Sequence, residues 1–324
     1  MLPKLEELEA AARIVHKVIS PTPAIQWPLL SAGCGAEVWV KHENHLPIGA
    51  FKLRGGLTYF DHLARSSTKI SGVIAATRGN HGQSIAFAAG RYGIGATIVV
   101  PQGNSREKNA AMRVLGANLI EHGSDFQDAL QFAADQARVM NLAMVPSFDP
   151  ELVVGVASYA LEFLQSVADL DTVYVPIGLG SGICGVIAAR EALHLKTTVV
   201  GVVAERAPTY ALSFKAGQPV ATDSAATFAD GVACRVPDPR AVAIINRYAD
   251  RIVTVTEDQI ADAVRFYFSD THNVAEGAGA TPLAALIRER DQMAGRKVGL
   301  ILSGGNIDRD LYTKILAGES IAAA

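Results

Sequence analysis

The sequence predicts an α/β protein with two parallel sheets, each enclosed between helices as an αβα domain. Three observations predict this class. Apolar segments of strand length alternate with helical segments along most of the 324 residues, glycine-rich loops follow three of these segments, and hydrophobic residues make up 49% of the chain. Alternating strands and helices are typical of βαβ units, which build parallel sheets. The hydrophobic content allows a sizeable core, and the length suits one large domain or two ordinary ones.

The first half of the chain opens with a helix and then alternates regularly. Apolar residues recur at helical spacing over residues 5–19, and Pro21 and Pro23 end this pattern. Strands are expected at residues 36–43, 71–77, 96–101, 117–123 and 142–147. Between the later strands, helices are expected at residues 81–93, 105–116 and 125–141. This order predicts parallel strands joined by helical crossovers.

The alternation resumes in the second half of the chain. Strands are expected at residues 172–177, 197–205, 251–256 and 297–303, with helices at 183–193 and from Glu257 onward. Residues 206–240 show weak periodicity and contain several Pro and Asp residues, so we expect loop and short helix that could cover a site. In such sheets, ligands bind at the carboxyl ends of the strands.

Composition excludes several classes of function. Lys and Arg number 29 against 32 Asp and Glu, a net charge of −3, which lacks the basic surplus that nucleic-acid binding needs. No apolar run approaches the roughly 18 residues of a membrane span. The charged first turns do not resemble a secretory signal. We therefore expect a cytoplasmic protein without nucleic-acid or membrane partners.

Cysteine and histidine form no metal-binding pattern. Cys34, Cys184 and Cys234 are odd in number and widely spaced, as expected for reduced thiols in the cytoplasm. His42 and His45 have a spacing that could hold a metal on a helix. Because they follow a strand-like segment, we expect polar surface or loop residues instead.

Three glycine-rich loops follow expected strands. They are Thr-Arg-Gly-Asn-His-Gly at 77–82, Gly-Leu-Gly-Ser-Gly-Ile-Cys-Gly at 178–185 and Ser-Gly-Gly-Asn at 303–306. Glycine lets the backbone approach an anion, and a following helix N-terminus supplies free N–H groups. Three such loops at the same sheet edge would predict an anion-binding site rather than three ordinary turns.

The second loop also fits a dinucleotide fingerprint. Gly180, Gly182 and Gly185 match GxGxxG after a strand, and Glu205 ends the next strand where a ribose-binding acid belongs. An NAD-dependent oxidoreductase is therefore an alternative. Two facts weaken it, since the motif lies past the middle of the chain and the other two loops have no place in it.

Lys52 lies in the apolar, glycine-bounded segment Gly-Ala-Phe-Lys-Leu-Arg-Gly-Gly at 49–56. Such a lysine can extend its charged end to solvent. Alternatively, it is a desolvated amine with a lowered pKa, suited to Schiff-base chemistry. The segment alone does not decide between these interpretations.

Taken together, the motifs resemble those of a known family. GAFKLRGG, TRGNHGQS, GLGSG, ADGVA (229–233), AEGAGA (275–280) and SGGN occur in this order over nearly the whole chain. The sequence resembles pyridoxal-phosphate enzymes of fold type II, the tryptophan-synthase β type, and within them the serine/threonine dehydratase and serine racemase family. The resemblance implies a large domain (1–52 and 149–324), a small domain (53–148), the cofactor in the cleft between them, and a homodimer or homotetramer.

The resemblance also implies site residues. Lys52 would form the Schiff base with pyridoxal 5'-phosphate and act as the catalytic base. Further cofactor contacts would come from Phe51 beside the ring, Asn80 at the phenolic oxygen, Gly231 and Glu276 near the ring, Ser303 at the pyridine nitrogen, and Gly178, Leu179, Gly180, Ser181 and Gly182 around the phosphate. The substrate carboxylate would bind Thr77, Asn80 and His81.

The sequence departs from the family at several positions. Leu179 and Ser181 replace glycines of the phosphate loop but leave its backbone donors. Arg78 replaces the serine that serves racemases as acid/base, and a guanidinium cannot be a base, so racemisation is not expected. Arg78 would either bind a second substrate carboxylate or pair with a neighbouring acid. Ala211 replaces a carboxylate that accompanies Glu205 in cation-binding members, so no metal is expected.

The sequence therefore predicts a pyridoxal-phosphate-dependent dehydratase, or ammonia-lyase. It would convert a small β-hydroxy amino acid such as L-threonine or L-serine to a 2-oxo acid and ammonia. Residues 155–158 read Gly-Val-Ala-Ser where the family usually has GQGT, so specificity can differ. 3-Hydroxyaspartate, phenylserine and a hydroxylated diamino acid remain alternative substrates.

Overall fold

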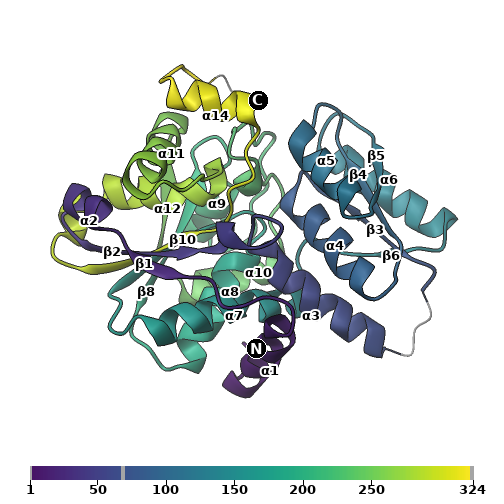
Figure 1. Cartoon of the computed structure of the whole chain (residues 1–324), viewed down its shortest axis with the longest axis horizontal. Helices are drawn as coiled ribbons and strands as arrows, with labels where there is room; N and C mark the ends of the chain where they lie inside the picture. The colour runs from purple at the N-terminus through teal and green to yellow at the C-terminus, as the bar shows by residue number, and fades with distance from the viewer. Residues whose placement is uncertain (1, 67–69, 322–324) are drawn as a thin grey trace.

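The computed structural model describes residues 2–66 and 70–321, and its strands form two sheets (Figure 1). The strands of the larger sheet come from both ends of the chain: β1 (Ala24–Gln26), β2 (Glu37–His42), β7 (Thr172–Pro176), β8 (Thr198–Ala204), β9 (Arg251–Val255) and β10 (Lys297–Leu302). The strands of the smaller sheet are β3 (Val73–Ala76), β4 (Ala96–Val100), β5 (Asn118–Glu121) and β6 (Ala143–Met144).

Both sheets are parallel apart from one edge strand. The larger sheet has the order β1-β2-β10-β7-β8-β9, and the smaller one β5-β4-β3-β6. Only β1 pairs antiparallel among the described strands, with Ala24 opposite Lys41. The remaining pairs are all parallel. The predicted α/β class with two parallel sheets is confirmed.

Helices cover both sheets. In the N-terminal half they are α1 (Leu5–His16), α2 (Pro28–Cys34), η1 (Glu43–His45), α3 (Lys52–Arg65), α4 (Asn80–Arg91), α5 (Arg106–Val114) and α6 (Phe126–Val139). In the C-terminal half they are α7 (Pro150–Ser166), α8 (Ser181–Ala192), α9 (Thr209–Ala216), η2 (Asp230–Val232), α10 (Pro239–Tyr248), α11 (Glu257–Thr271), α12 (Gly277–Arg288), α13 (Arg290–Met293) and α14 (Arg309–Leu316). None of the helices described is both long and apolar enough to cross a membrane.

The core has one apolar cluster on each face of the larger sheet. Side chains of α11 and α12 pack against one face, and side chains of α7, α8 and α10 pack against the other. In the smaller sheet, α3, α4 and α5 share a cluster with one face, while α6 packs on the opposite one. Both sheets are therefore the middle layer of an αβα sandwich.

Helix α3 was not expected from the sequence, where its first residues read as a glycine-bounded loop. Its glycines instead allow close packing on both sides. A Cβ atom on Gly55 would lie 2.8 Å from the carbonyl oxygen of Leu152 on α7, and one on Gly56 would lie 2.2 Å from Ser84 Oγ on α4. Lys52 is thus the first residue of a helix that connects the two sheets.

We expected the three glycine loops to lie at one sheet edge. They lie instead at the edges of two different sheets. The loops after β7 and β10 lie at the carboxyl edge of the larger sheet, where these strands are neighbours. The loop at 77–82 follows β3 in the smaller sheet. Since that sheet is a separate one, the site is formed where the carboxyl edges of two sheets face each other.

The expectation of exposed loop histidines is wrong for His42. This residue ends β2, is fully buried, and accepts a hydrogen bond of 2.9 Å at Nε2 from Trp27 Nε1. Burial lowers the pKa of His42 to about 4, so the ring is neutral. His45 is exposed, as expected. The three cysteines are free and buried.

A buried ion network holds α3 against the larger sheet. The guanidinium of Arg54 has no exposed surface and donates to Glu43 on η1 (2.7 Å) and to Glu162 on α7 (2.6 Å). Lys41 Nζ also donates to Glu162, at 2.5 Å. Burial alone would raise the pKa of Glu162, but its contacts with Arg54 and Lys41 lower that pKa to about 2. Glu162 is therefore charged at neutral pH where it meets Arg54 and Lys41.

We predict that Arg54→Met destabilises the protein by about 3–5 kcal/mol, because it leaves Glu43 and Glu162 buried without their main partner. Arg65→Met is the matched control, since Arg65 lies on the same helix with an exposed side chain paired to Asp61. Urea unfolding of the two variants measures the difference. Equal free energies of unfolding would contradict the structural importance of the network.

Candidate active site

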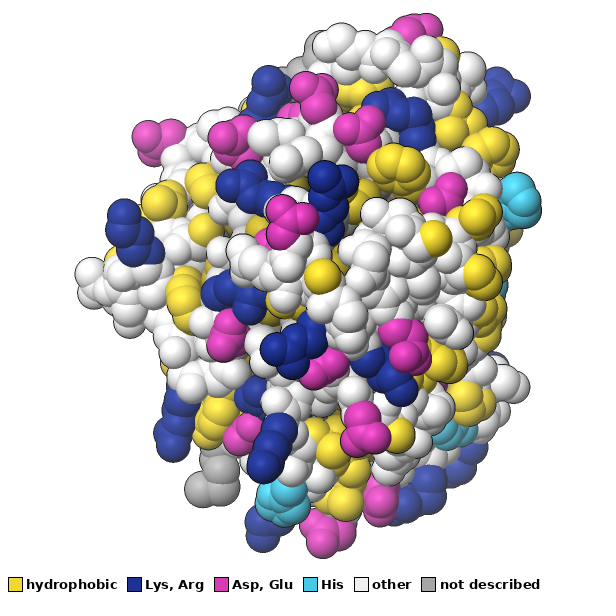
Figure 2. All heavy atoms as spheres, turned by 90° about the vertical axis from the view of Figure 1, so that its left-hand side faces the viewer, with side chains coloured by type: hydrophobic (Ala, Val, Ile, Leu, Met, Phe, Trp, Pro, Cys, Tyr) yellow, Lys and Arg dark blue, Asp and Glu magenta, His cyan; other side chains and the backbone are white. Residues whose placement is uncertain are grey.

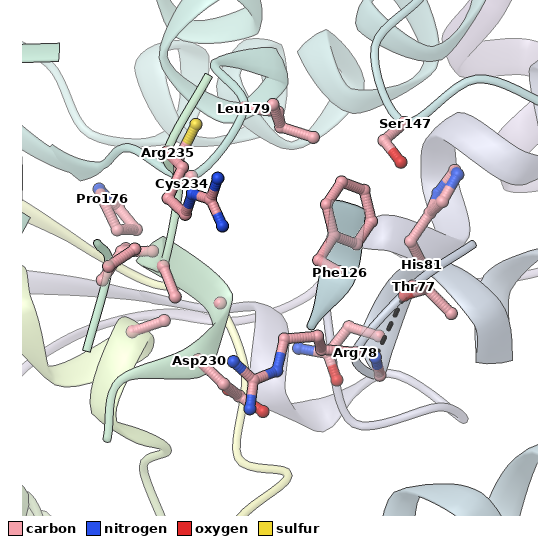
Figure 3. Close-up of a pocket in the computed structure, with 18 of the residues that line it drawn as sticks. Thr77, Arg78, His81, Phe126, Ser147, Pro176, Leu179, Asp230, Cys234 and Arg235 are labelled. Atoms are coloured by element: carbon pink, nitrogen blue, oxygen red, sulfur yellow. Dashed lines mark hydrogen bonds between the residues drawn. The ribbon is translucent and has the colours of Figure 1, made fainter. Parts of the chain in front are cut away.

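A cavity of about 400 Å³ lies between the two sheets (Figure 3). Its walls come from the loops after β3, β7 and β10, from the start of α3, and from residues 124–127, 223–226 and 230–236. Figure 3 shows Thr77, Arg78 and His81 on one side of the cavity, and Pro176, Cys234 and Arg235 on the other. The cavity therefore has one wall from each sheet.

Every site residue predicted from the sequence lines this one cavity. They are Phe51, Lys52, Thr77, Arg78, Asn80, His81, Gly178, Leu179, Gly180, Ser181, Gly182, Gly231, Glu276 and Ser303. These residues come from distant parts of the chain, so the fold brings them together. Their individual roles stay predictions.

Lys52 is held against the glycine loop that follows β7. Its Nζ donates to Ser181 Oγ at 3.0 Å and lies 5.0 Å from the centre of the Phe51 ring. Ser84 Oγ donates to the carbonyl of Lys52 at 2.7 Å, which fixes the first turn of α3. Burial lowers the pKa of Lys52 to about 8. A sizeable neutral fraction near pH 7–8 is what a nucleophilic or basic amine requires.

The loop at 178–182 has a shape that only glycine permits at two positions. Gly180 has φ of +99°, and a Cβ atom there would lie 2.6 Å from Ala241 Cβ. A Cβ atom on Gly178 would lie 2.3 Å from the carbonyl oxygen of Gly231. The hydroxyl of Tyr210 donates to the carbonyl of Leu179 at 2.8 Å and holds the turn. The tight turn brings the backbone to the cavity.

This loop fits a phosphate group. It leads into the first turn of α8, and no acceptor among the described residues takes the backbone N–H groups of Ser181, Gly182 and Ile183. A helix N-terminus with free N–H groups and its positive dipole end binds anions. Gly182 has room on its cavity side, since a Cβ atom there would meet nothing closer than 3.6 Å.

The opposite wall presents further polar groups to the cavity. Gly79 N donates to Thr77 Oγ1 at 3.0 Å, which shapes the loop after β3. Burial, and then the positive charge of Lys52, lower the pKa of His81 to about 3, so its ring is neutral. His81 Nε2 is buried and has no hydrogen-bond partner among the described residues. A polar group of a ligand in the cavity would supply the partner that this nitrogen lacks.

Among the described residues, Arg78 has no acidic partner, which argues against one of the two alternatives left by the sequence. It is half-buried, it makes no ion pair with any described residue, and its Nε is buried without a hydrogen-bond partner. Two carboxylates of the cavity wall have other partners, since Asp230 pairs with Lys108 and Asp125 pairs with Arg235. Arg78 therefore offers an uncompensated charge to the cavity.

Sequence reasoning missed Lys108, Asp125 and Arg235. Lys108 lies on α5 but is buried, and its Nζ donates to Asp230 (2.6 Å) and to Glu276 (3.2 Å). Lysine is common on exposed helix faces, so nothing in the pattern of residues 105–116 marks Lys108 as a site residue. The positions of its partners on the far wall depend on the tertiary fold.

The dinucleotide interpretation does not fit this geometry. Glu205 is exposed and does not line the cavity. Gly185 serves helix packing, since a Cβ atom there would lie 3.0 Å from the backbone nitrogen of Ala157 on α7. The glycine pattern at 180–185 thus combines an anion-binding turn with a helix contact. Among the described residues, no group of His, Cys, Asp and Glu could hold a metal ion.

Comparison with known proteins identifies the relatives. Residues 15–304 match a family model described as "Pyridoxal-phosphate dependent enzyme". An L-threonine ammonia-lyase of Thermotoga maritima is 35% identical over 96% of this chain and 78% of its own. An L-threo-3-hydroxyaspartate ammonia-lyase of Saccharomyces cerevisiae is 30% identical over 98% of both chains. The match to a biosynthetic L-threonine dehydratase of Pasteurella multocida, 33% identical, spans 58% of that protein's length.

The fold comparison agrees with the sequence comparison. The crystal structure of a threonine deaminase from T.th. has a TM-score of 0.87 and 31% identity, covering 94% of this chain and 99% of that one. Maize serine racemase shares the fold with a TM-score of 0.89 at 24% identity, covering 98% of both chains. The resemblance inferred from the motifs is confirmed, and the family shown is that of pyridoxal-phosphate enzymes rather than NAD-dependent oxidoreductases.

We predict that Gly180→Asp weakens pyridoxal-phosphate binding at least about tenfold, whereas Ser181→Gly changes it little. Aspartate would force a Cβ into Ala241 and place a negative charge beside the phosphate. Ser181→Gly keeps the backbone donors. Titration of each apoprotein with the cofactor, followed by absorbance, gives both affinities. Equal affinities would place the phosphate elsewhere.

Proposed function

We propose that this chain, which belongs to the family of pyridoxal-phosphate dependent enzymes, is a dehydratase that releases a 2-oxo acid and ammonia from a small β-hydroxy amino acid. L-Threonine and L-serine are the first substrates to consider, because L-threonine ammonia-lyases are among its relatives. The observation that carries the proposal is the position of Lys52. Its Nζ lies against a loop that fits a phosphate and opposite a wall that fits a carboxylate.

The residues around the cavity suit the cofactor. The N–H groups of Ser181, Gly182 and Ile183 would hold its phosphate, and Lys52 would bind its aldehyde carbon. Ser303, buried at the end of β10, would face the pyridine nitrogen. When bound, the cofactor supplies an electron sink for the charge that develops at the substrate α-carbon. A serine hydroxyl keeps that sink modest, which suits elimination, where the negative charge is short-lived.

The chain's own groups would then carry out the proton chemistry. Thr77, Asn80 and His81 would orient the substrate carboxylate at the wall after β3. Lys52, with its pKa lowered to about 8, would take the α-proton as general base. The C–H and the β C–O bonds break and water leaves. The released enamine then takes up water to give the 2-oxo acid and ammonia.

A second candidate is a substrate with a carboxylate on its side chain. Arg78 supports it, because this guanidinium reaches the cavity without an ion-pair partner among the described residues. The relatives of this chain include L-threo-3-hydroxyaspartate ammonia-lyases of Saccharomyces cerevisiae and a Pseudomonas species. Phenylserine and hydroxylated diamino acids offer no negative side chain to Arg78, so they are weaker candidates.

We also propose that the protein forms a homodimer or homotetramer in the cytoplasm. Leu29 on α2 and Phe266 and Phe268 on α11 are exposed apolar side chains on packed neighbouring helices. Figure 2 views this side of the molecule, where hydrophobic side chains lie between charged ones. Exposed apolar surface of this kind favours self-association. The free, buried cysteines agree with a reducing compartment.

We predict that Lys52→Ala lowers keto-acid release from L-threonine or L-serine at least about 100-fold, since the variant loses its general base. Lys215→Ala, at an exposed position on α9, is the control and keeps wild-type activity. Coupled assays of 2-oxobutanoate and pyruvate measure the rates. Unchanged release by the Lys52 variant would contradict the proposed mechanism. A wild-type protein inactive on every β-hydroxy amino acid would contradict the function itself.

We predict that Arg78→Ser lowers the kcat/KM ratio of 3-hydroxyaspartate to threonine about 10- to 100-fold, the value of a charge-assisted contact. Arg78→Lys keeps part of the preference because it keeps the charge. Parallel kcat/KM measurements on both substrates give the ratio. An unchanged ratio in Arg78→Ser would show that Arg78 does not bind the carboxylate on the substrate side chain.

A further inference from the structure

We propose that Lys108 is a positioning residue that reaches across the cavity and, through Glu276, fixes the amide of Asn80 toward the bound cofactor. This goes beyond the proposed reaction and rests on it only for the activity measurements. Lys108 and Glu276 do not need to touch the substrate in this role. They act through the orientation of Asn80, which does line the reaction space.

The three charges come from opposite walls. Lys108 lies on α5, beside the smaller sheet, and its side chain is 6% exposed. It donates at 2.6 Å to Asp230 on η2 and at 3.2 Å to Glu276, which precedes α12. Both carboxylates belong to the layer that packs on the larger sheet. A single ammonium group therefore joins the two walls at the cavity.

Glu276 passes this constraint to Asn80. Its Oε1 accepts a hydrogen bond of 2.7 Å from Asn80 Nδ2. At the other end of the amide, Asn80 Oδ1 accepts one of 2.8 Å from Asn306 Nδ2. An ionised carboxylate can only accept, so it requires the NH₂ side of Asn80 to face it. One N–H of that group then remains available to a ligand in the cavity.

The ionised state of Glu276 depends on Lys108. Glu276 is buried, and burial raises its pKa, while the neighbouring ammonium of Lys108 lowers it and the carboxylate of Asp230 raises it. Among the residues that the structure describes, the other polar side chain bonded to Glu276 is that of Asn80. Without the cation, Glu276 would take up a proton at higher pH. A protonated carboxyl can donate, so it would also tolerate the flipped amide of Asn80.

The stem of Lys108 has a separate, steric role. A Cβ atom on Gly79 would lie 2.5 Å from Lys108 Cδ, so the stem packs directly under the loop that carries Arg78 and Asn80. Methionine keeps an unbranched stem of similar length but has no charge. Lys108→Met therefore removes the ion pairs while leaving most of this packing, and it isolates the effect of the charge.

The test uses the full-length protein loaded with pyridoxal phosphate. The absorbance of the bound cofactor and kcat/KM are both measured against pH. If ionised Glu276 is required, activity falls as the pH drops through its pKa. We call this fall of kcat/KM at low pH the acid limb. Lys108→Met is expected to move the midpoint of the acid limb, and that of the spectral titration, up by about 1–3 pH units. Asp230→Asn removes a like charge and moves them the opposite way. Lys108→Arg restores the wild-type limb.

Arg113→Met is the matched control, because Arg113 lies on α5 with an exposed side chain paired to Glu121. It is expected to leave the titration unchanged. A wild-type titration in Lys108→Met, or equal shifts of the same sign in Lys108→Met and Asp230→Asn, would overturn the proposal. If Lys108→Met does not fold, the opposite shift in Asp230→Asn decides. The spectral titration needs no turnover, so it still tests Lys108 if the proposed reaction fails.

Discussion

The position of Lys52 depends on the ion pairs that the buried guanidinium of Arg54 makes. Arg54 lies two residues after Lys52 on α3. It forms ion pairs with Glu43 on η1 and Glu162 on α7. A charged group with no exposed surface stays with its partners, because leaving it buried and unpaired costs several kcal/mol. The first turn of α3 is thereby fixed against the larger sheet, with Lys52 Nζ at the glycine loop.

Each side of the cavity contributes a different kind of anion recognition. The larger sheet ends in a loop whose free N–H groups suit a phosphate, and the smaller sheet ends in a loop with Thr77, Arg78 and His81. Lys52 lies between them with a pKa lowered to about 8. The arrangement favours a zwitterionic substrate held by its carboxylate, with a basic amine near its α-carbon.

Much of the fold and of the candidate site could be predicted from the sequence. Buried parallel strands occur in the sequence as short apolar runs, and the glycine loops follow them directly. The remainder depended on tertiary packing. Helix α3 was missed because Gly55 and Gly56, which weaken a helical pattern, are there for close contact with α7 and α4. Lys108 was missed because its two carboxylate partners lie more than 100 residues away in the chain. Local spacing carries no signal for such a contact.

Reduction of the protein with borohydride in the presence of pyridoxal phosphate tests the central claim most directly. The reagent fixes the cofactor to the lysine that binds it, and peptide mapping by mass spectrometry identifies that lysine. The account predicts a single labelled peptide that contains Lys52, the one lysine among the residues described whose ammonium group lies at the glycine loop after β7. A label on Lys108 or on another lysine, or no label at all, would contradict it.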